Sequence, residues 1–496
     1  MRSIIGKRQI WAALAALVCV AAAALALPRL LPPATAGQRA LAASEGLNRY
    51  VFDLEFLPEE TALTVSLTLD YANHTGGSVQ DLILRTWAGA YRSEETSPAA
   101  IDELFDACYP QGFSPGGIEV TEARWNDQAV EAVFEDTAQT VLRVPVGELP
   151  AGSGGQLTLQ CRLTVPNCAH RFGFSKGVWQ FGNALPILSV WQDGAWRTDA
   201  YFPIGDPFFS ECANYSVTLT APSDFLCAAT GVRRGQKTAD GKQVITLEAE
   251  AVREFSFSLS DQWQKATARV NGIAVESYAF TREAAQRAAG YARKVLREYG
   301  SLYGDYPYAG LTLCAVDFPF GGMEYPGLIF AGLPYYGEEW ADSLELLIAH
   351  EAAHQWFYAL VGSDQVNEPW QDEALCEYAL LRYVRSVYGQ SAYENLVLTR
   401  VDAPMKERIP QRVTPGSPIS YFGSLDVYSA VVYGRGAALL LAVEEMTGKT
   451  DAFLKAYCDA FAFQIASRED FITLLNRVTQ EDMEPLAADY LDTLMQ

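Results

Sequence analysis

Histidine is scarce in this sequence, which has only four in 496 residues, and two of the four, His350 and His354, lie one helical turn apart. The eight cysteines beyond residue 44 include no CxxC pair, so they do not predict a metal site. We expect them to be buried small side chains, with one or two disulfides as the alternative. No segment repeats at a fixed period, and a content of 49% apolar residues excludes a disordered chain.

Basic residues are also in short supply, with 37 Lys and Arg against 60 Asp and Glu and a net charge of −23. The first 44 residues contain no acidic residue, and removing their five basic residues leaves 32 basic against 60 acidic residues, or −28. A surface this acidic repels phosphate groups. We therefore exclude nucleic acid and anionic membrane surfaces as partners.

An unbroken apolar run of 18 residues, from Ile10 to Leu27, follows the first basic residues. Such a run is just long enough to span a bilayer, and the positive-inside rule puts the acidic remainder outside the cytoplasm. We therefore predict that residues 1–44 form a membrane anchor and that the catalytic part is extracellular. The alternative is a signal peptide cleaved after the Ala-Thr-Ala pattern at residues 34–36, which would give a secreted protein.

The length of 496 residues exceeds one comfortable hydrophobic core and predicts two domains behind the leader. Apolar and polar residues alternate repeatedly between residues 45 and 265, which is typical of half-buried strands. The alternation is clearest over residues 50–56, 63–71, 157–165, 215–219 and 255–259. We predict an all-β, sandwich-like domain without chemistry of its own, in which His74 and His170 are surface or packing residues.

The chain from residue 266 to 496 changes to helical spacing and predicts a second, mainly helical domain. We expect one strand over 270–278, a helix over 282–303, and strands over 311–316 and 328–333. Two helices should follow, the first from Asp342 or Ser343 to Val361 and the second from Asn367 to Gly389. Further helices are predicted over 430–446, 451–463 and 469–478.

The motif His-Glu-Ala-Ala-His at residues 350–354 carries the chemistry. On a helix, His350 and His354 project from one face and can bind one cation, while Glu351 stays free to act on a metal-bound water. A hydrolytic zinc site needs a third protein ligand, and the candidate is Glu373, which follows His354 after 18 residues. Glu377, one turn further, would orient a ligating histidine, with an ordinary surface glutamate as the alternative. A purely structural histidine pair would bury charged Glu351 at a cost.

Three motifs in a fixed order resemble those of the aminopeptidase N family of zinc metallopeptidases, the gluzincins. They are the zinc motif with its distant glutamate, Gly-Gly-Met-Glu-Tyr at 321–325 and Tyr-Gly-Arg-Gly-Ala at 433–437. The last two are similar to the family's Gly-x-Met-Glu-Asn and Tyr-x-Lys-Gly-Ala, and the likeness covers roughly residues 45 to 490. Tyr325 stands where the family has Asn, which leaves the shape of the amine pocket open, and Arg435 replaces Lys.

The resemblance implies a thermolysin-like catalytic domain, over residues 266–496, behind the β domain of residues 45–265. It also implies one zinc ion per chain, Zn²⁺, held by His350, His354 and Glu373. Glu351 would be the general base and Tyr433 would stabilise the oxyanion, with Tyr428 as its rival.

The glycine-rich motif implies the substrate class. Glu324 would bind the free α-ammonium group of a peptide, within a loop formed with Gly321, Gly322 and Met323. The implied function is an aminopeptidase that uses a zinc-activated water to hydrolyse the N-terminal peptide bond of peptides with a free N-terminus.

Two other functions stay open, namely a zinc endopeptidase on the same scaffold and a non-catalytic member that only binds peptides. Only 63 residues follow Tyr433, so we expect a short form that lacks the helical C-terminal domain common in the family. Its cleft would be more open unless a partner or a second copy covers it.

Overall fold

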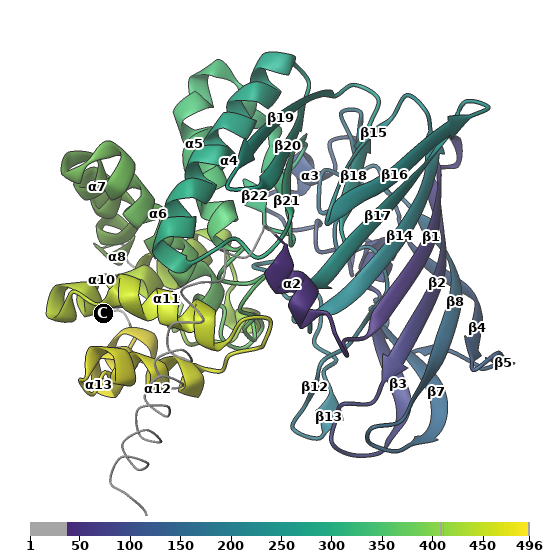
Figure 1. Ribbon diagram of the computed structural model, residues 1–496, viewed down its shortest axis with the longest axis horizontal. Helices are drawn as coiled ribbons and strands as arrows, with labels where there is room; N and C mark the ends of the chain where they lie inside the picture. Colours follow the sequence, from purple (N-terminus) through teal and green to yellow (C-terminus); the bar gives the residue numbers. More distant parts are fainter. Residues whose placement is uncertain (1–36, 407–408, 410, 495–496) are drawn as a thin grey trace, which may run out of the picture.

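The computed structural model describes residues 37–406, 409 and 411–494. A β-rich domain comes first and a mainly helical domain follows, so the predicted fold class is confirmed (Figure 1). The predicted membrane anchor depends on the apolar run 10–27, which lies outside the described residues, and it stays a prediction.

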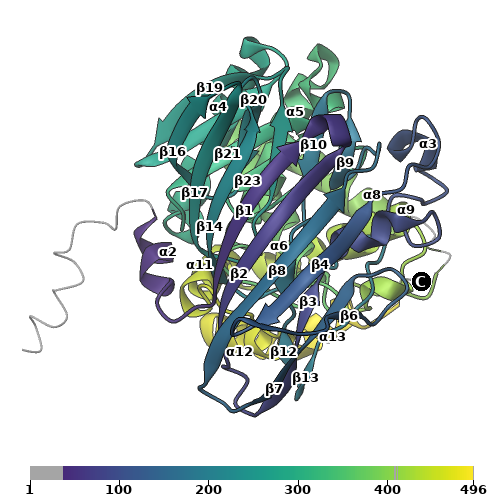
Figure 2. The same cartoon turned by 90° about the vertical axis from the view of Figure 1, so that its right-hand side faces the viewer.

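The β-rich domain is built on an eight-stranded sheet in the order β16-β17-β14-β1-β2-β8-β4-β5, whose broad face is seen in Figure 2. The alternating segments form β1 (Arg49–Leu57), β2 (Ala62–Ala72), β8 (Gly154–Thr164) and β14 (Ala213–Pro222), as predicted. The other strands are β4 (Gly117–Trp125), β5 (Gln128–Ala129), β16 (Val232–Ala239) and β17 (Lys242–Val252). Every second residue of β1 is buried, because a strand turns successive side chains to opposite faces.

Smaller sheets cover the inner face of the large one. One has the order β15-β18-β10-β9 and another β11-β3-β7-β6. Their strands are β15 (Leu226–Ala229), β18 (Phe257–Ser260), β10 (Val178–Phe181), β9 (Phe172–Ser175), β11 (Ile187–Leu188), β3 (Val79–Arg85), β7 (Val141–Leu149) and β6 (Val133–Phe134). Phe56 of β1 meets Phe181 of β10 with 6.1 Å between ring centroids, so the sheets share one core. The eight cysteines beyond residue 44 are free and buried, as expected.

The strand expected over residues 270–278 is confirmed from Ile273 onward as β20, but its expected beginning is wrong, because the chain makes a hairpin there. β19 (Gln264–Val270) pairs antiparallel with β20 (Ile273–Ala279), and Val270 lies opposite Ile273. The turn is Asn271-Gly272, and both residues have positive φ, 49° and 83°. Asn-Gly is the strongest short hairpin signal because glycine and asparagine tolerate this conformation, so the sequence carried the information.

The hairpin opens a five-stranded sheet in the order β19-β20-β21-β23-β22, which lies beside the helices that carry the metal motif (Figure 1). Its other strands are β21 (Gly310–Val316), β23 (Leu328–Gly332) and the edge strand β22 (Gly322–Met323). The helices α4 (Arg282–Tyr303) and α5 (Ala341–Ala353) pack on it. Helix α4 has the predicted bounds, with Thr281 as its N-cap.

Helix α5 ends eight residues before the predicted end at Val361. Beyond Ala353 the chain continues in tight turns whose polar groups bond outside the helix. The carbonyl of Tyr358 accepts a hydrogen bond from Arg253 and the carbonyl of Ala359 accepts one from Tyr308. Such tertiary partners replace the regular backbone bonds and override the apolar spacing that predicted a longer helix.

Helix α6 (Trp370–Tyr388) begins after Pro369 and ends before Gly389, close to its prediction. The remaining α-helices of the helical domain are α7 (Gln390–Val397), α8 (Ala403–Lys406), α9 (Leu425–Tyr428), α10 (Gly436–Thr447), α11 (Thr450–Ala460), α12 (Arg468–Thr479) and α13 (Glu484–Leu491). In the described part of the chain, one helical stretch, Leu425–Thr447, is long and apolar enough to cross a membrane. It packs against α6 and 67% of its most apolar window is buried, as in the core helix of a soluble domain.

Two neighbouring side chains join the domains. The guanidinium of Arg253 donates to the carbonyl oxygens of Tyr358 at 2.6 Å, Ser210 at 2.9 Å and Gln464 at 2.7 Å. Glu254 accepts hydrogen bonds from Tyr358 and from Asn183. Both side chains are almost fully buried, so this polar contact holds the domains in one arrangement.

Candidate metal centre and substrate cleft

Three of the predicted ligands meet at one point. His350 lies near the end of α5, His354 caps it, and Glu373 lies in the first turn of α6. The separations are 3.3 Å between the two Nε2 atoms, 3.2 Å from His350 Nε2 to Glu373 Oε2, and 3.5 Å from His354 Nε2 to the same oxygen. A tetrahedral zinc ion with bonds of about 2.0–2.1 Å has ligand separations of about 3.3–3.4 Å, so this triangle fits it.

The opposite ring nitrogens of both histidines face carboxylates. His354 Nδ1 lies 2.6 Å from Asp372, which also accepts a hydrogen bond from Gln365. His350 Nδ1 lies 3.4 Å from Glu377. Glu377 therefore lies beside a ligand histidine, as the sequence prediction requires. The sequence analysis did not identify Asp372, although it directly precedes Glu373. Carboxylates in these positions fix the ring orientation and the tautomer of a ligating histidine.

The carboxylates of the site have pKa values shifted in opposite directions. Burial acts to raise the pKa of Glu373, yet hydrogen bonds with His350 and His354 hold it far below its usual range. Burial raises the pKa of Glu351 to about 7, and the two histidines only partly oppose this shift. These environments separate the pKa values of the two acids, which suits Glu373 as a charged ligand and Glu351 as a proton acceptor.

The glycine-rich motif runs beside the metal ligands. Gly321 has a φ of 103°, a conformation that side chains disfavour. A Cβ at Gly322 would overlap the carboxylate of Glu351, so β22 lies directly against that side chain. The sulfur of Met323 accepts from Arg171 Nε at 3.1 Å, which ties the loop to the β-rich domain.

Glu324 points its carboxylate toward the metal triangle. A carboxylate oxygen of Glu324, one of Glu351 and a ring nitrogen of His354 all lie within 4.8 Å of one another. Glu324 is buried, and its Oε1 has no hydrogen-bond partner in the part of the chain that the structure describes. Burial raises the pKa of Glu324 well above its usual value. A cation at this position would supply the positive charge that the ionised, buried carboxylate of Glu324 needs as a partner.

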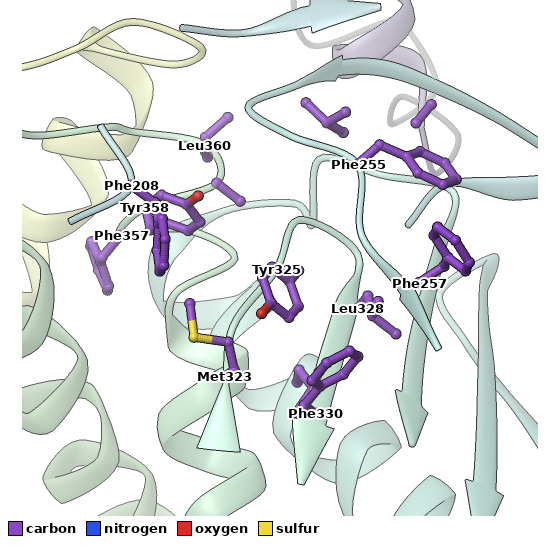
Figure 3. Close-up of a cluster of buried hydrophobic side chains, with 14 of the residues drawn as sticks. Phe208, Phe255, Phe257, Met323, Tyr325, Leu328, Phe330, Phe357, Tyr358 and Leu360 are labelled. Atoms are coloured by element: carbon purple, nitrogen blue, oxygen red, sulfur yellow. The ribbon is translucent and has the colours of Figure 1, made fainter. Parts of the chain in front are cut away.

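Tyr325, which departs from the resembled motif, fills a buried space between the domains. Figure 3 shows its ring among apolar side chains from both, with Phe257 on one side and Met323 on the other. Its hydroxyl lies against the backbone of Gly182, where any Cβ would overlap it. The carbonyl of Tyr325 accepts a hydrogen bond from Gln355 Nε2 at 3.1 Å, so the turn that follows α5 holds the loop in place.

The two candidate tyrosines lie side by side. The ring of Tyr433 stacks on His350 with 5.6 Å between centroids and 19° between planes. Tyr428 meets Tyr433 edge to face at 5.8 Å, and its hydroxyl lies near Gly205 instead. Stacking on a candidate ligand brings Tyr433 closer to the metal triangle. Arg435 points away from the site, because it donates to the carbonyls of Asp489 and Tyr490.

A cavity of about 600 Å³ is lined by the three metal-ligand candidates, by Glu324 and Glu351, and by both tyrosines. Its wall includes Arg171 and Asp206 of the β-rich domain, which form an ion pair with each other. The β-rich domain therefore lines part of the cavity, because tertiary contact and not sequence spacing places the pair here, and the expectation that it has no chemistry of its own stays a prediction. His170 is buried and packs on Tyr91, and His74 is exposed, as expected for packing and surface residues.

The fold and the ligand triangle are those of the zinc metallopeptidases. Residues 288–490 match the model of the peptidase family M1 domain, the family that the three sequence motifs resemble, and this likeness indicates a zinc cofactor.

Curated relatives are consistent with this assignment. Aminopeptidase M1-D of Oryza sativa subsp. japonica is 23% identical over 375 residues, 72% of this chain and 42% of the relative. Aminopeptidase B of Rattus norvegicus is 26% identical over 313 residues, 59% of this chain and 46% of the relative. The chain thus spans less than half the length of these relatives.

Solved structures agree in fold. The M1 zinc metallopeptidase from Deinococcus radiodurans has a TM-score of 0.65 at 17% identity, over 91% of this chain and 95% of that one. A mutant of that enzyme bound to a Tyr-Ser-Ala substrate has a TM-score of 0.61 at 18% identity, over 90% and 95% of the two chains. These likenesses extend over both domains and establish the architecture.

Proposed function

We propose that this protein is a zinc-dependent aminopeptidase that hydrolyses the N-terminal peptide bond of peptides. The observation that carries the proposal is the buried carboxylate of Glu324, which lies beside the metal triangle and has an oxygen without a partner among the described residues. An α-ammonium group is the cation that a peptide brings to this position. A substrate held there offers only its first peptide bond to the metal.

The proposed ligands of the zinc ion are His350, His354 and Glu373, one ion for each chain. Two imidazole nitrogens and a carboxylate oxygen are a typical donor set for catalytic zinc, and their separations of 3.2, 3.3 and 3.5 Å support the assignment. When bound, zinc polarises the scissile carbonyl and acidifies a water molecule.

The residues around the triangle have separate tasks in the proposed reaction. Glu351 accepts a proton from the attacking water and delivers it to the nitrogen of the leaving peptide as the carbon–nitrogen bond breaks. A pKa raised by burial to about 7 suits both transfers. Tyr433 donates a hydrogen bond to the oxygen on which negative charge develops.

The alternative functions lack such support. An endopeptidase has no use for an unpaired carboxylate buried beside the zinc ligands, because an uncharged main chain that passes through the cleft brings no cation to it. A protein that only binds peptides has no use for the buried general base Glu351.

The test incubates the zinc-loaded protein with a panel of aminoacyl reporter amides, each paired with its N-acetylated form. We expect cleavage of the free-amine substrates only, with full loss on treatment with a chelator. Glu351→Gln should lower kcat by about 10²–10⁴-fold without lowering zinc content, because it removes the proton acceptor. Glu324→Gln should raise KM by about tenfold or more, the value of a charge-assisted hydrogen bond.

Equal cleavage of the acetylated substrates would reject the aminopeptidase and favour the endopeptidase. Binding of the peptides with no turnover would favour the non-catalytic alternative. Loss of zinc in Glu324→Gln would show that this glutamate belongs to the metal and not to the substrate.

A further inference from the structure

One cation is accessible in the wall of the cavity that contains the metal triangle. Arg400 lies in the π-helical segment Leu398–Asp402 that follows α7, and its side chain is 42% exposed. The other arginine of the wall, Arg171, is only 6% exposed and is paired with Asp206. Among the described residues of the wall, Arg400 is therefore the group that an anion can reach.

The guanidinium of Arg400 has one free edge. Its Nε and Nη2 donate to the two carboxylate oxygens of Glu377 at 2.5 and 2.8 Å. Its Nη1 has no partner in the part of the chain that the structure describes. The pair with Glu377 holds the guanidinium in a fixed orientation, so Nη1 can donate to a ligand without a further loss of side-chain entropy.

Glu324 and Arg400 approach the metal triangle at different histidines, which gives the cavity a direction. Glu324 clusters with Glu351 and His354. Arg400 is connected to the other histidine. It donates to Glu377, whose carboxylate lies 3.4 Å from His350 Nδ1. A peptide with its ammonium group at Glu324 therefore extends across the triangle toward Arg400.

We propose that Arg400 binds the C-terminal carboxylate of short peptides and that the preferred substrates are small peptides with a free carboxyl group. This inference depends on the proposed aminopeptidase function. An extended peptide advances about 3.3–3.6 Å per residue, so only a peptide of a few residues puts its carboxylate next to a group this close to the metal. Longer peptides gain nothing from Arg400, since an amide oxygen carries no full charge.

The test compares a free tripeptide such as Leu-Gly-Gly with its C-terminal amide in the same enzyme preparation, together with a matched hexapeptide pair. We expect kcat/KM to be about tenfold higher for the free tripeptide than for its amide, the size of one charge-assisted hydrogen bond. The ratio should fall to about one for the hexapeptide pair and for the tripeptide pair in Arg400→Gln. Because each ratio compares two substrates on one enzyme, a change in zinc content cancels.

The matched control is Arg382→Gln. Arg382 forms the same two-point ion pair, with Asp451, but lies outside the cavity, so its loss should leave the tripeptide ratio unchanged. Binding of the same peptides to Glu351→Gln, measured by calorimetry, gives the ratio without turnover.

A wild-type ratio near one, or a ratio that survives Arg400→Gln, would overturn the inference and leave the aminopeptidase intact. Failure of the enzyme to cleave either form, while the calorimetric ratio persists, would reject the proposed function and keep the carboxylate site.

Discussion

At the scale of single residues, Asp372 is the group whose importance the sequence hid. Its carboxylate lies 2.6 Å from His354 Nδ1 and is itself held by Gln365. This arrangement fixes a proton on Nδ1 and leaves Nε2 free to bind a metal. The neutral amide of asparagine would keep the shape of the contact but remove its charge.

Asp372→Asn should therefore weaken zinc binding by about tenfold or more. The measurement is a zinc dissociation constant obtained by competition with a coloured chelator at neutral pH. Asp193→Asn, in an exposed turn of the β-rich domain, is the control and should bind zinc as the wild type does. An unchanged constant in Asp372→Asn would mean that His354 is oriented by other contacts.

At the scale of elements, the site depends on how closely the edge strand β22 approaches α5. The absence of a side chain at Gly322 lets the carboxylate of Glu351 lie against the strand. Gly322 does not have a positive φ, so the space and not the backbone conformation requires glycine. A methyl group there must push the carboxylate of Glu351, the proposed general base, away from its position.

Gly322→Ala should lower kcat by about 10²-fold, the usual cost of displacing a catalytic group by about an ångström. Steady-state kinetics and zinc content measure the effect, and zinc content should stay unchanged. Gly290→Ala is the matched control, because a Cβ at Gly290 in α4 meets nothing within 4 Å. A wild-type kcat in Gly322→Ala would show that Glu351 adapts to the methyl group at no cost.

Elements were predictable where the signal is local. The helix over 282–303 and the alternation over 50–71 depend on residues close in sequence, and the structure agrees with both. The end of α5 was not predictable, because distant partners such as Arg253 and Tyr308 bond to the chain beyond it. The hairpin at Asn271-Gly272 was predictable and was missed.

The same distinction applies to the site. The spacing of His350, Glu351 and His354 within one helix turn, and of Glu373 in the next helix, is a local pattern. Arg171 and Asp206 reach the cavity only through the packing of one domain on the other. No pattern within their own strands and loops marks them.

At the scale of the whole molecule, the buried contact between the domains responds to pH. Burial raises the pKa of Glu254 to about 7, although hydrogen bonds from Tyr358 and Asn183 act to lower it. The unfolded chain loses this proton near pH 4.5, whereas the folded protein keeps it until about pH 7. Between these values the folded state binds more protons, so this group makes the protein less stable as pH rises.

Glu254→Gln removes the charge and keeps groups that can hydrogen bond to both partners. It should raise the free energy of unfolding by up to about 3 kcal/mol at pH 8 and have little effect at pH 4.5. Thermal or denaturant unfolding of wild type and variant at the two pH values measures the difference. A gain of equal size at both pH values would contradict the titration of Glu254 as its source.

The contact between Gly182 and Tyr325 couples two positions in different domains, because the residue at one position restricts which residues the other can accept. Gly182 has no positive φ, so space and not backbone conformation restricts this position, and a Cβ there would overlap the hydroxyl and ring of Tyr325 and come too close to the carbonyl oxygen of Arg171. A lineage that keeps tyrosine at 325 must keep glycine at 182, whereas the smaller asparagine at 325 removes the tightest of these contacts. The two positions should therefore covary among relatives, and the residue at position 182 of the β-rich domain should indicate which residue follows Glu324.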